Sequence, residues 1–169
     1  MKKIIVTMSF LVFSILSFTQ TVDIPDSYSF EKAEDYKQYE DKIIASVNWL
    51  INTPLSEQQN EREKIQKFLF TWIVGAPNVT IELDEKIINF MASSPHALII
   101  FMGGWTRQAL QSGTDSKLEG NIAGIEAVIE YYKKNKAILK KDKKIEKHIT
   151  MQEEGTLRNF VKKKLKIEE

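Results

Sequence analysis

The 169-residue chain contains no cysteine. This absence excludes a disulfide framework, a thiolate metal site and a cysteine nucleophile together. It also excludes the lipid-modified cysteine that tethers some exported bacterial proteins to a membrane. The fold must therefore be stabilised by its core alone, and a domain of about 150 residues buries roughly 68–70% of its surface, which is enough.

Histidine is almost as scarce, with His96 and His148 as the two examples. Neither belongs to a His-Glu-x-x-His or Glu-x-x-His motif, which would place two metal ligands on one helix face. The sequence also lacks a phosphate-binding loop, a dinucleotide fingerprint and a Gly-x-Ser-x-Gly elbow. We therefore expect no metal and no cofactor, and no catalytic residues can be assigned. His96 is expected in the first turn of a helix, as a surface or hinge residue.

The longest mostly apolar run lies at the N-terminus, where residues 4–18 follow Lys2 and Lys3. A run of about 15 residues is shorter than the roughly 20 that a membrane-spanning helix needs. Small residues occur at its end in the spacing Ser17-x-Thr19. A basic start, an apolar centre and a small-residue end are together typical of a secretory signal peptide.

This layout predicts cleavage between Thr19 and Gln20, so that residues 1–19 are a signal peptide and residues 20–169 form a single mature domain. The alternative is that the segment stays in place as a membrane anchor. With cleavage the protein is exported, either to the periplasm or out of the cell, and the sequence does not distinguish these two destinations.

The near-neutral net charge hides an asymmetry along the chain. Residues 130–169 hold 13 Lys or Arg and 7 Asp or Glu, a local charge of +6, whereas residues 20–129 hold 9 basic and 16 acidic residues, a local charge of −7. The lysine-rich C-terminal region either faces an anionic partner or docks on the acidic body of the same chain. Lysine dominates over arginine there and few aromatics are interleaved, so we expect no nucleic-acid partner.

Apolar residues recur at steps of three and four through most of the mature chain, which is the pattern of amphipathic helices. Short connections between successive helices favour antiparallel neighbours. We therefore expect an all-α fold, either an irregular bundle or stacked helical hairpins of six to seven helices. The expected helices cover residues 27–52, 56–75, a short stretch after Asp84 to residue 91, 94–113, 116–135, 142–154 and 156–165. The stripe of the second comprises Ile65, Phe68, Leu69, Trp72 and Ile73, and that of the sixth comprises Ile145, His148 and Ile149.

Local signals mark where several of these helices begin. Ser56 with Gln59, and Ser116 with Glu119, have the spacing of capping boxes. The dipeptide 94–95, Ser-Pro, predicts a helix with serine as its N-cap and proline at its first position. Residues 79–83 alternate between apolar and polar, and without a visible partner strand we interpret them as an extended connector rather than as part of a sheet.

The stretch ALIIFMGGWTRQAL, residues 97–110, places two adjacent glycines inside the most apolar helix. Each glycine destabilises a helix by about 1 kcal/mol relative to alanine. Four explanations are open: close approach of another helix, space for Trp49 or Trp72, a kink, or a ligand lying over bare backbone between Trp105 and Arg107. The ligand hypothesis assigns to its site Gly103, Gly104, Trp105, Arg107, His96 and Trp72.

A resemblance to known proteins rests on the Lys-Lys signal, on the cysteine-free helical body and on three segments. These segments are FLFTWIVGAPNVTIEL, IIFMGGWTRQAL and NIAGIEAVIEYYKKN. The mature chain resembles exported bacterial proteins to which no activity is assigned. This resemblance implies an exported helical domain but no function.

Residues 68–109 also resemble the layout of small periplasmic immunity proteins. Both have an aromatic-rich helix that ends in glycine, a short helix, a Ser-Pro break and an apolar helix. Immunity proteins block a secreted toxin by binding it, so the resemblance implies an inhibitor. This chain differs from them in having no cysteine and a long C-terminal extension, and no binding residue is carried over.

The sequence therefore favours an exported, non-enzymatic helical domain that binds a protein or a small ligand. One alternative is a periplasmic enzyme with helix-borne carboxylates or His96 in a groove near residues 103–105. Another is an immunity-like inhibitor of a secreted toxin. A further hypothesis is weak electrostatic contact between the lysine-rich region and a membrane surface. The ligand, the partner and the oligomeric state are left open.

Overall fold

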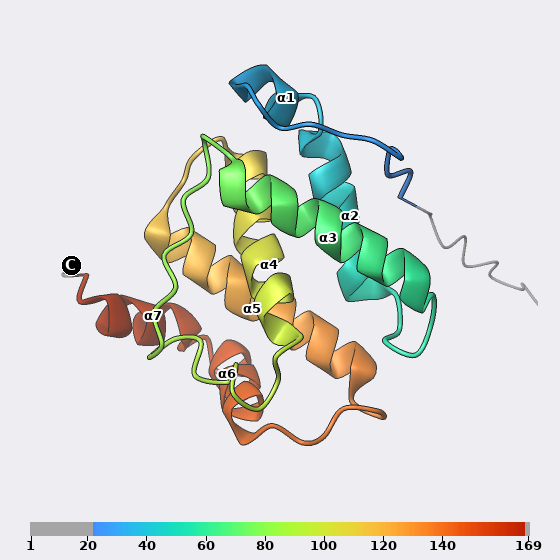
Figure 1. Ribbon diagram of the computed structural model, residues 1–169. Helices are drawn as coiled ribbons and strands as arrows, with labels where there is room; N and C mark the ends of the chain where they lie inside the picture. The colour runs from blue at the N-terminus through green and yellow to red at the C-terminus, as the bar shows by residue number, and fades with distance from the viewer. Residues whose placement is uncertain (1–21, 168–169) are drawn as a thin grey trace, which may run out of the picture.

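The computed structural model describes residues 22–167. This part of the chain contains seven helices and no strand (Figure 1). The expectation of an all-α bundle is confirmed. The predicted signal peptide, residues 1–19, lies outside the described residues. The helices are α1 (Ala33–Lys37), α2 (Glu40–Asn52), α3 (Gln59–Gly75), α4 (Ala97–Ser112), α5 (Lys117–Asn135), α6 (Lys143–Glu153) and α7 (Leu157–Leu165).

α4 lies at the centre of the bundle, where it contacts α2, α3 and α5 (Figure 1). Its buried side chains include Ile100, Phe101, Trp105 and Ala109. A helix that neighbours surround needs apolar residues all round rather than along a single stripe. This position explains why residues 97–105 form the most apolar stretch of the mature chain.

The first predicted helix, residues 27–52, is wrong at its beginning. Residues 22–32 contain no helix, and the rest is divided into α1 and α2 by a turn at residues 38–39. Phe30 packs its ring on Tyr36 with centroids 5.0 Å apart, and Tyr36 donates a hydrogen bond to the Phe30 carbonyl at 3.1 Å. The Phe30 ring also packs on Phe68 of α3, with centroids 6.0 Å apart. Aromatic packing against α3 therefore overrides the helical spacing of this segment.

A long connector, residues 76–96, joins α3 to α4. Residues 79–83 form no strand, as we expected, and no helix. The short helix predicted after Asp84 is wrong, because residues 85–92 form successive turns. The carboxylate of Asp84 accepts a hydrogen bond from the backbone N–H of Lys86 at 2.8 Å, and the turns bury Ile87 and Phe90 in the core.

One of the two predicted capping boxes forms an N-cap. The Oγ atom of Ser116 accepts a hydrogen bond from the Glu119 N–H at 3.3 Å, which confirms the start of α5. The Ser56 prediction is wrong: α3 is preceded by Gln58 in the left-handed conformation, with φ of 49°. The Gln59 side chain instead donates to the carbonyl of Leu55.

The predicted Ser-Pro start of α4 is also wrong in detail. The helix begins at Ala97, and the preceding residues form a turn in which the Ala97 N–H donates to the Ser94 carbonyl at 2.9 Å. The Ser94 hydroxyl does not cap the helix, because it donates to the carboxylate of Asp142 at 3.1 Å. The Ser-Pro motif predicted that the Ser94 hydroxyl would cap α4. Instead this hydroxyl bonds to Asp142, which is distant in the sequence.

Candidate functional site

The two adjacent glycines of α4 face different helices. A Cβ atom at Gly104 would lie 2.5 Å from the Cβ of Ala127 and 2.6 Å from the carbonyl oxygen of Ala123, both on α5. A Cβ atom at Gly103 would lie 3.0 Å from Val47 on α2 and 3.4 Å from Leu69 on α3. The pair thus lets helices approach α4 from different directions at the same turn, and the helix-approach explanation accounts for both glycines.

The approach of α5 is reciprocal. A Cβ atom at Gly120 would lie 2.2 Å from the Trp105 ring, and one at Gly124 would lie 2.6 Å from the Phe101 ring. Trp105 is buried, and its Nε1 donates to the Asp115 carboxylate at 3.2 Å. Small residues on α5 therefore make room for large ones on α4, and Trp105 is part of this interface.

The other two tryptophans do not fill space beside the glycines. Trp72 lies in the core on α3, and its Nε1 donates to the carbonyl of Tyr36 at 3.0 Å. Trp49, on α2, lies under the guanidinium of Arg62, with 5.4 Å between the Cζ atom and the ring centroid. Among the predicted site residues, Trp72 is therefore a core residue that is hydrogen-bonded to α1.

Arg107 borders a shallow, open depression of about 350 Å³ between α4 and α5. It is partly exposed and donates to the Asn48 side chain at 2.7 Å. The lining residues include no carboxylate and no histidine: Gly104, Arg107, Gln108, Gln111, Ser112 and Ala123. His96 is exposed at the opposite end of α4, about 16 Å away along a helix that rises 1.5 Å per residue. The structure thus brings Gly104 and Arg107 together but separates both from His96.

Arg62 is a buried charge that the sequence analysis missed. It is 3% exposed, and within residues 22–167 it has no carboxylate partner. Its Nη2 donates to the carbonyls of Thr53 at 2.8 Å and Pro54 at 3.0 Å, just after α2. Burial lowers the pKa of the guanidinium, and the nearby Tyr131 opposes this effect. A cation at a helix C-terminus is favourable, so Arg62 is explained by capping α2.

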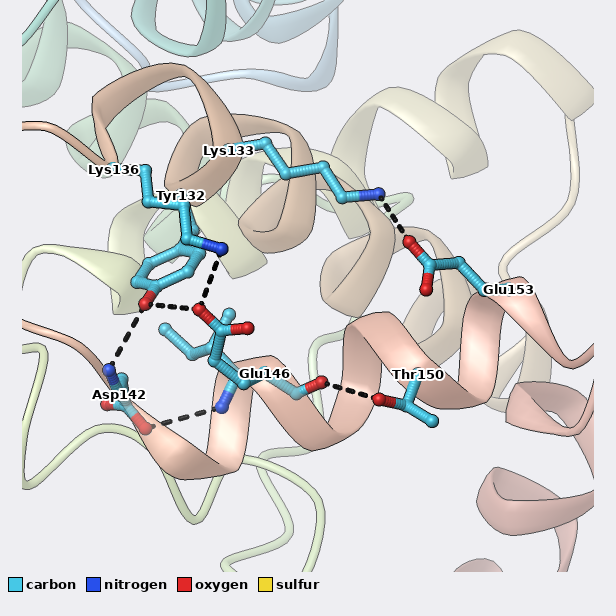
Figure 2. A network of polar contacts seen from close by, with 8 residues as sticks. Tyr132, Lys133, Lys136, Asp142, Glu146, Thr150 and Glu153 are labelled. Carbon is cyan, nitrogen blue, oxygen red and sulfur yellow. Dashed lines mark hydrogen bonds and ion pairs between the residues drawn. The ribbon is translucent and has the colours of Figure 1, made fainter.

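Asp142 is the second buried charge, and it joins three parts of the fold. As the N-cap of α6 it accepts from the Lys144 N–H at 2.9 Å, and it accepts hydroxyl hydrogen bonds from Ser93 and Ser94 in the connector. Its own N–H donates to the Tyr132 hydroxyl of α5 at 3.2 Å (Figure 2). Burial alone would raise the pKa of this carboxyl, but the hydrogen bonds that the carboxylate accepts from the two serines and from the start of α6 outweigh burial and lower the pKa.

Glu146 lies one turn further along α6 and points back toward α5 (Figure 2). Its carboxylate accepts from the Lys136 ammonium at 3.0 Å and from the Tyr132 hydroxyl at 3.0 Å. These two hydrogen bonds, that from Lys136 first, lower the pKa of Glu146. Tyr132 therefore links Asp142 and Glu146, the two acids at the start of α6, to the end of α5.

His148 lies on the buried face of α6 with Ile145 and Ile149, as its spacing predicts. Its ring lies between Phe90 of the connector and Phe160 of α7, with centroids 5.9 Å and 5.4 Å away. Burial lowers its pKa to about 4, with the charge of Lys147 as a smaller cause and Asp142 as an opposing one. At neutral pH the ring is uncharged and acts as a packing residue.

Two large apolar side chains project from the outer face of α3. Phe70 is 51% exposed and Val74 is 68% exposed. Both are apolar residues that fall outside the predicted stripe of this helix, which is the signal by which the sequence could have identified them. We call Phe70 and Val74 the α3 pair.

A second depression, of about 430 Å³, lies between the start of the described chain and α3. It brings together acidic and basic side chains, and it is lined by Val22, Asp23, Ile24, Pro25, Asp26, Tyr28, Glu61, Lys64 and Lys67. In the same described part of the chain, no group of three or more His, Asp or Glu side chains is arranged to hold a metal ion.

None of the helices between residues 22 and 167 is both long enough and apolar enough to cross a bilayer. Comparison of the chain with models of protein families, with curated proteins and with solved structures finds no match in any of the three.

Proposed function

We propose that the chain is an exported helical domain that acts by binding a protein partner through the α3 pair. The observation that carries this proposal is the exposure of Phe70 and Val74, one turn apart on the same helix face. The opposite face of α3 already anchors the helix with Ile65, Phe68, Leu69 and Trp72. The exposed pair is therefore not needed to hold α3 in the bundle.

The energetics of the pair suit a binding contact. Moving a phenylalanine or valine side chain from water into an interface stabilises the complex by about 1.5–3 kcal/mol. Aromatic anchors commonly carry a large share of the binding energy in protein interfaces. Adjacent exposed apolar residues mark partner sites more often than scattered single ones do.

The polar groups of the interior support binding over catalysis. Arg62 and Asp142, both of them buried charges, are each hydrogen-bonded within the fold. The depression beside Arg107 is lined by no acid or histidine that could transfer a proton. The enzyme alternative required a groove near residues 103–105. There Gly103 and Trp105 are buried by helix packing, and Gly104 borders only the shallow depression beside Arg107.

Export belongs to the same proposal and rests on the N-terminal sequence, with Lys2 and Lys3 before an apolar run and Ser17-x-Thr19 after it. Mass spectrometry of the protein recovered from fractionated cells tests it. We expect a chain that begins at Gln20 in the periplasmic fraction or in the medium. Intact Met1 in the cytoplasmic fraction would contradict export.

The binding proposal is tested by placing a photo-crosslinking amino acid at position 70 in cells that make the protein. We expect a discrete crosslinked product at this position and none at Gln111, an exposed control on α4. Because residues 68–109 resemble immunity proteins, a secreted toxin is the first partner to look for in the product. The variant F70S/V74S should keep the wild-type melting temperature and lose the partner.

Two outcomes would contradict the binding proposal. One is the absence of a crosslink at position 70. The other is substrate turnover by the purified protein that a single polar substitution abolishes, because that result would identify an enzyme.

A further inference from the structure

A second surface lies at the connection between α5 and α6, at the far end of the bundle from α1 (Figure 1). Residues 136–147 contain six lysines and two acids. We call these twelve residues the basic segment. Its lysines are Lys136, Lys140, Lys141, Lys143, Lys144 and Lys147, and its acids are Asp142 and Glu146.

Both acids of the basic segment are engaged within the fold. Asp142 is 5% exposed and is surrounded by hydroxyl and backbone donors. Glu146 is paired with Lys136 and hydrogen-bonded to Tyr132 (Figure 2). Both acids keep their negative charges, since their pKa values are lowered, and the segment as a whole carries a net charge of +4.

The other five lysines form no ion pair with any described residue. Lys144 donates to the carbonyl of Asn89, which leaves its charge uncompensated. All five are exposed, and they lie on the loop before α6 and on its first turns: Lys140, Lys141, Lys143, Lys144 and Lys147.

An apolar side chain accompanies this charge. Ile138 lies in the loop between α5 and α6, two residues from Lys136 and two from Lys140, and is 54% exposed. Lysines that surround an exposed aliphatic side chain are typical of surfaces that rest on a membrane, where the cations meet lipid headgroups and the aliphatic group enters the interface.

We propose that the basic segment docks the protein on a membrane surface that contains anionic phospholipid. Lysine presents a point charge without the bidentate fork of arginine, which suits a fluid layer of headgroups more than a fixed array of carboxylates. The exposed part of the segment has no aromatic side chain on which a nucleic-acid base could stack. The proposal does not depend on the α3 pair and requires only that the protein meets such a membrane.

The test is co-sedimentation of residues 20–169 with vesicles at low salt. The buried core of the described residues runs from Val22 to Val161, so this chain contains all of it. Vesicles of phosphatidylcholine with phosphatidylglycerol are compared with vesicles of phosphatidylcholine alone. We expect binding to the first and not to the second, and loss of binding at high salt, because salt screens exposed charges.

Two variants with the same change in net charge locate the contact. The first, K140Q/K141Q/K143Q/K147Q, removes four lysines of the basic segment, and each lysine near an anionic surface contributes about fivefold to the affinity. We expect it to bind at least about 100-fold more weakly. The control, K37Q/K64Q/K67Q/K86Q, removes four exposed lysines elsewhere and should bind as the wild type does.

A further variant, I138S, should weaken binding severalfold without changing the salt dependence. Equal losses in the two quadruple variants would show that net charge alone attracts the protein, and would overturn the proposal. Failure of the wild type to bind the anionic vesicles would also overturn the proposal. So would binding to polyglutamate without binding to vesicles, because that result would identify an acidic protein as the partner. Melting temperatures confirm that all variants are folded.

Discussion

Gly103 and Gly104 are neighbours in sequence but differ in what an added methyl group would meet. At Gly104 the nearest atoms include the backbone carbonyl oxygen of Ala123, which can move only if α5 moves. At Gly103 the nearest atoms are the side-chain ends of Val47 and Leu69, which can shift by a few tenths of an ångström. The same substitution therefore has different consequences at the two positions.

We predict that Gly104→Ala lowers the free energy of unfolding by about 1–3 kcal/mol, because overpacking exceeds the gain in helix propensity. Gly103→Ala should stay within about 1 kcal/mol of the wild type. Urea denaturation of both variants measures the difference. A Gly104→Ala protein as stable as the wild type would show that α5 does not approach α4 as closely as the structure has it.

The burial of Arg62 could not be predicted from the pattern of neighbouring residues in the sequence. Arg62 falls among polar residues at the start of α3, and its sequence neighbours do not reveal that its guanidinium reaches the end of α2. Phe70 and Val74 are different, since they are apolar residues off the stripe of their own helix. That signal depends only on spacing, so the exposure of the α3 pair could be predicted from the sequence. The burial of Arg62 could not.

At the scale of elements, the helix ends show when a local capping motif predicts the start of a helix and when it does not. Ser116 forms the N-cap of α5 because its backbone adopts the extended conformation that a cap requires, with φ of −102° and ψ of 119°. Ser56 has the same spacing to its partner but lies before the left-handed Gln58, outside the first turn of α3. The motif is therefore not sufficient by itself, since the path of the preceding loop decides whether the hydroxyl reaches the helix.

This contrast gives a matched pair of substitutions. Ser116→Ala removes an acceptor from the first turn of α5 and should destabilise the protein by about 1 kcal/mol. Ser56→Ala should leave the stability unchanged within about 0.5 kcal/mol, the usual range of surface substitutions. Thermal denaturation followed by circular dichroism measures both. Equal effects of the two substitutions would contradict the cap assignments.

At the scale of the whole molecule, His148 joins α6 to the connector and to α7. Burial lowers its pKa from 6.5 to about 4 in the folded state. As the pH falls, the unfolded chain therefore takes up a proton before the folded chain does. The stabilisation is complete above about pH 6.5 and is lost progressively down to about pH 4.

We predict that this linkage removes about 3 kcal/mol of stability between pH 7.5 and pH 4. His148→Leu should lose that part of the pH dependence, while His96→Gln, at the other and exposed histidine, should retain it. The carboxyl groups contribute equally to all three proteins, so the difference between their pH profiles isolates His148. Parallel profiles for His148→Leu and the wild type would refute the assignment.

The sequence by itself determined the helical class and several helix ends. The apolar spacing of α5 and its ends at Ser116 and Asn135, and the position of His148 on the inner face of α6, follow from residues within a few positions of each other. The lysine-rich composition of the C-terminal region was also visible. These features are local, and helix periodicity and capping act over one or two turns.

Only the tertiary structure decided which groups meet. Gly104 contacts α5 because that helix carries small residues at the matching height, and the composition of α4 alone could not identify this neighbour. Ser94 and Asp142 are 48 positions apart, and their hydrogen bond overrides the local capping motif. In residues 136–147, Asp142 is buried and Glu146 pairs with Lys136, so the other five lysines form no ion pair with a described residue. Such contacts depend on the packing of distant segments, which periodicity does not encode.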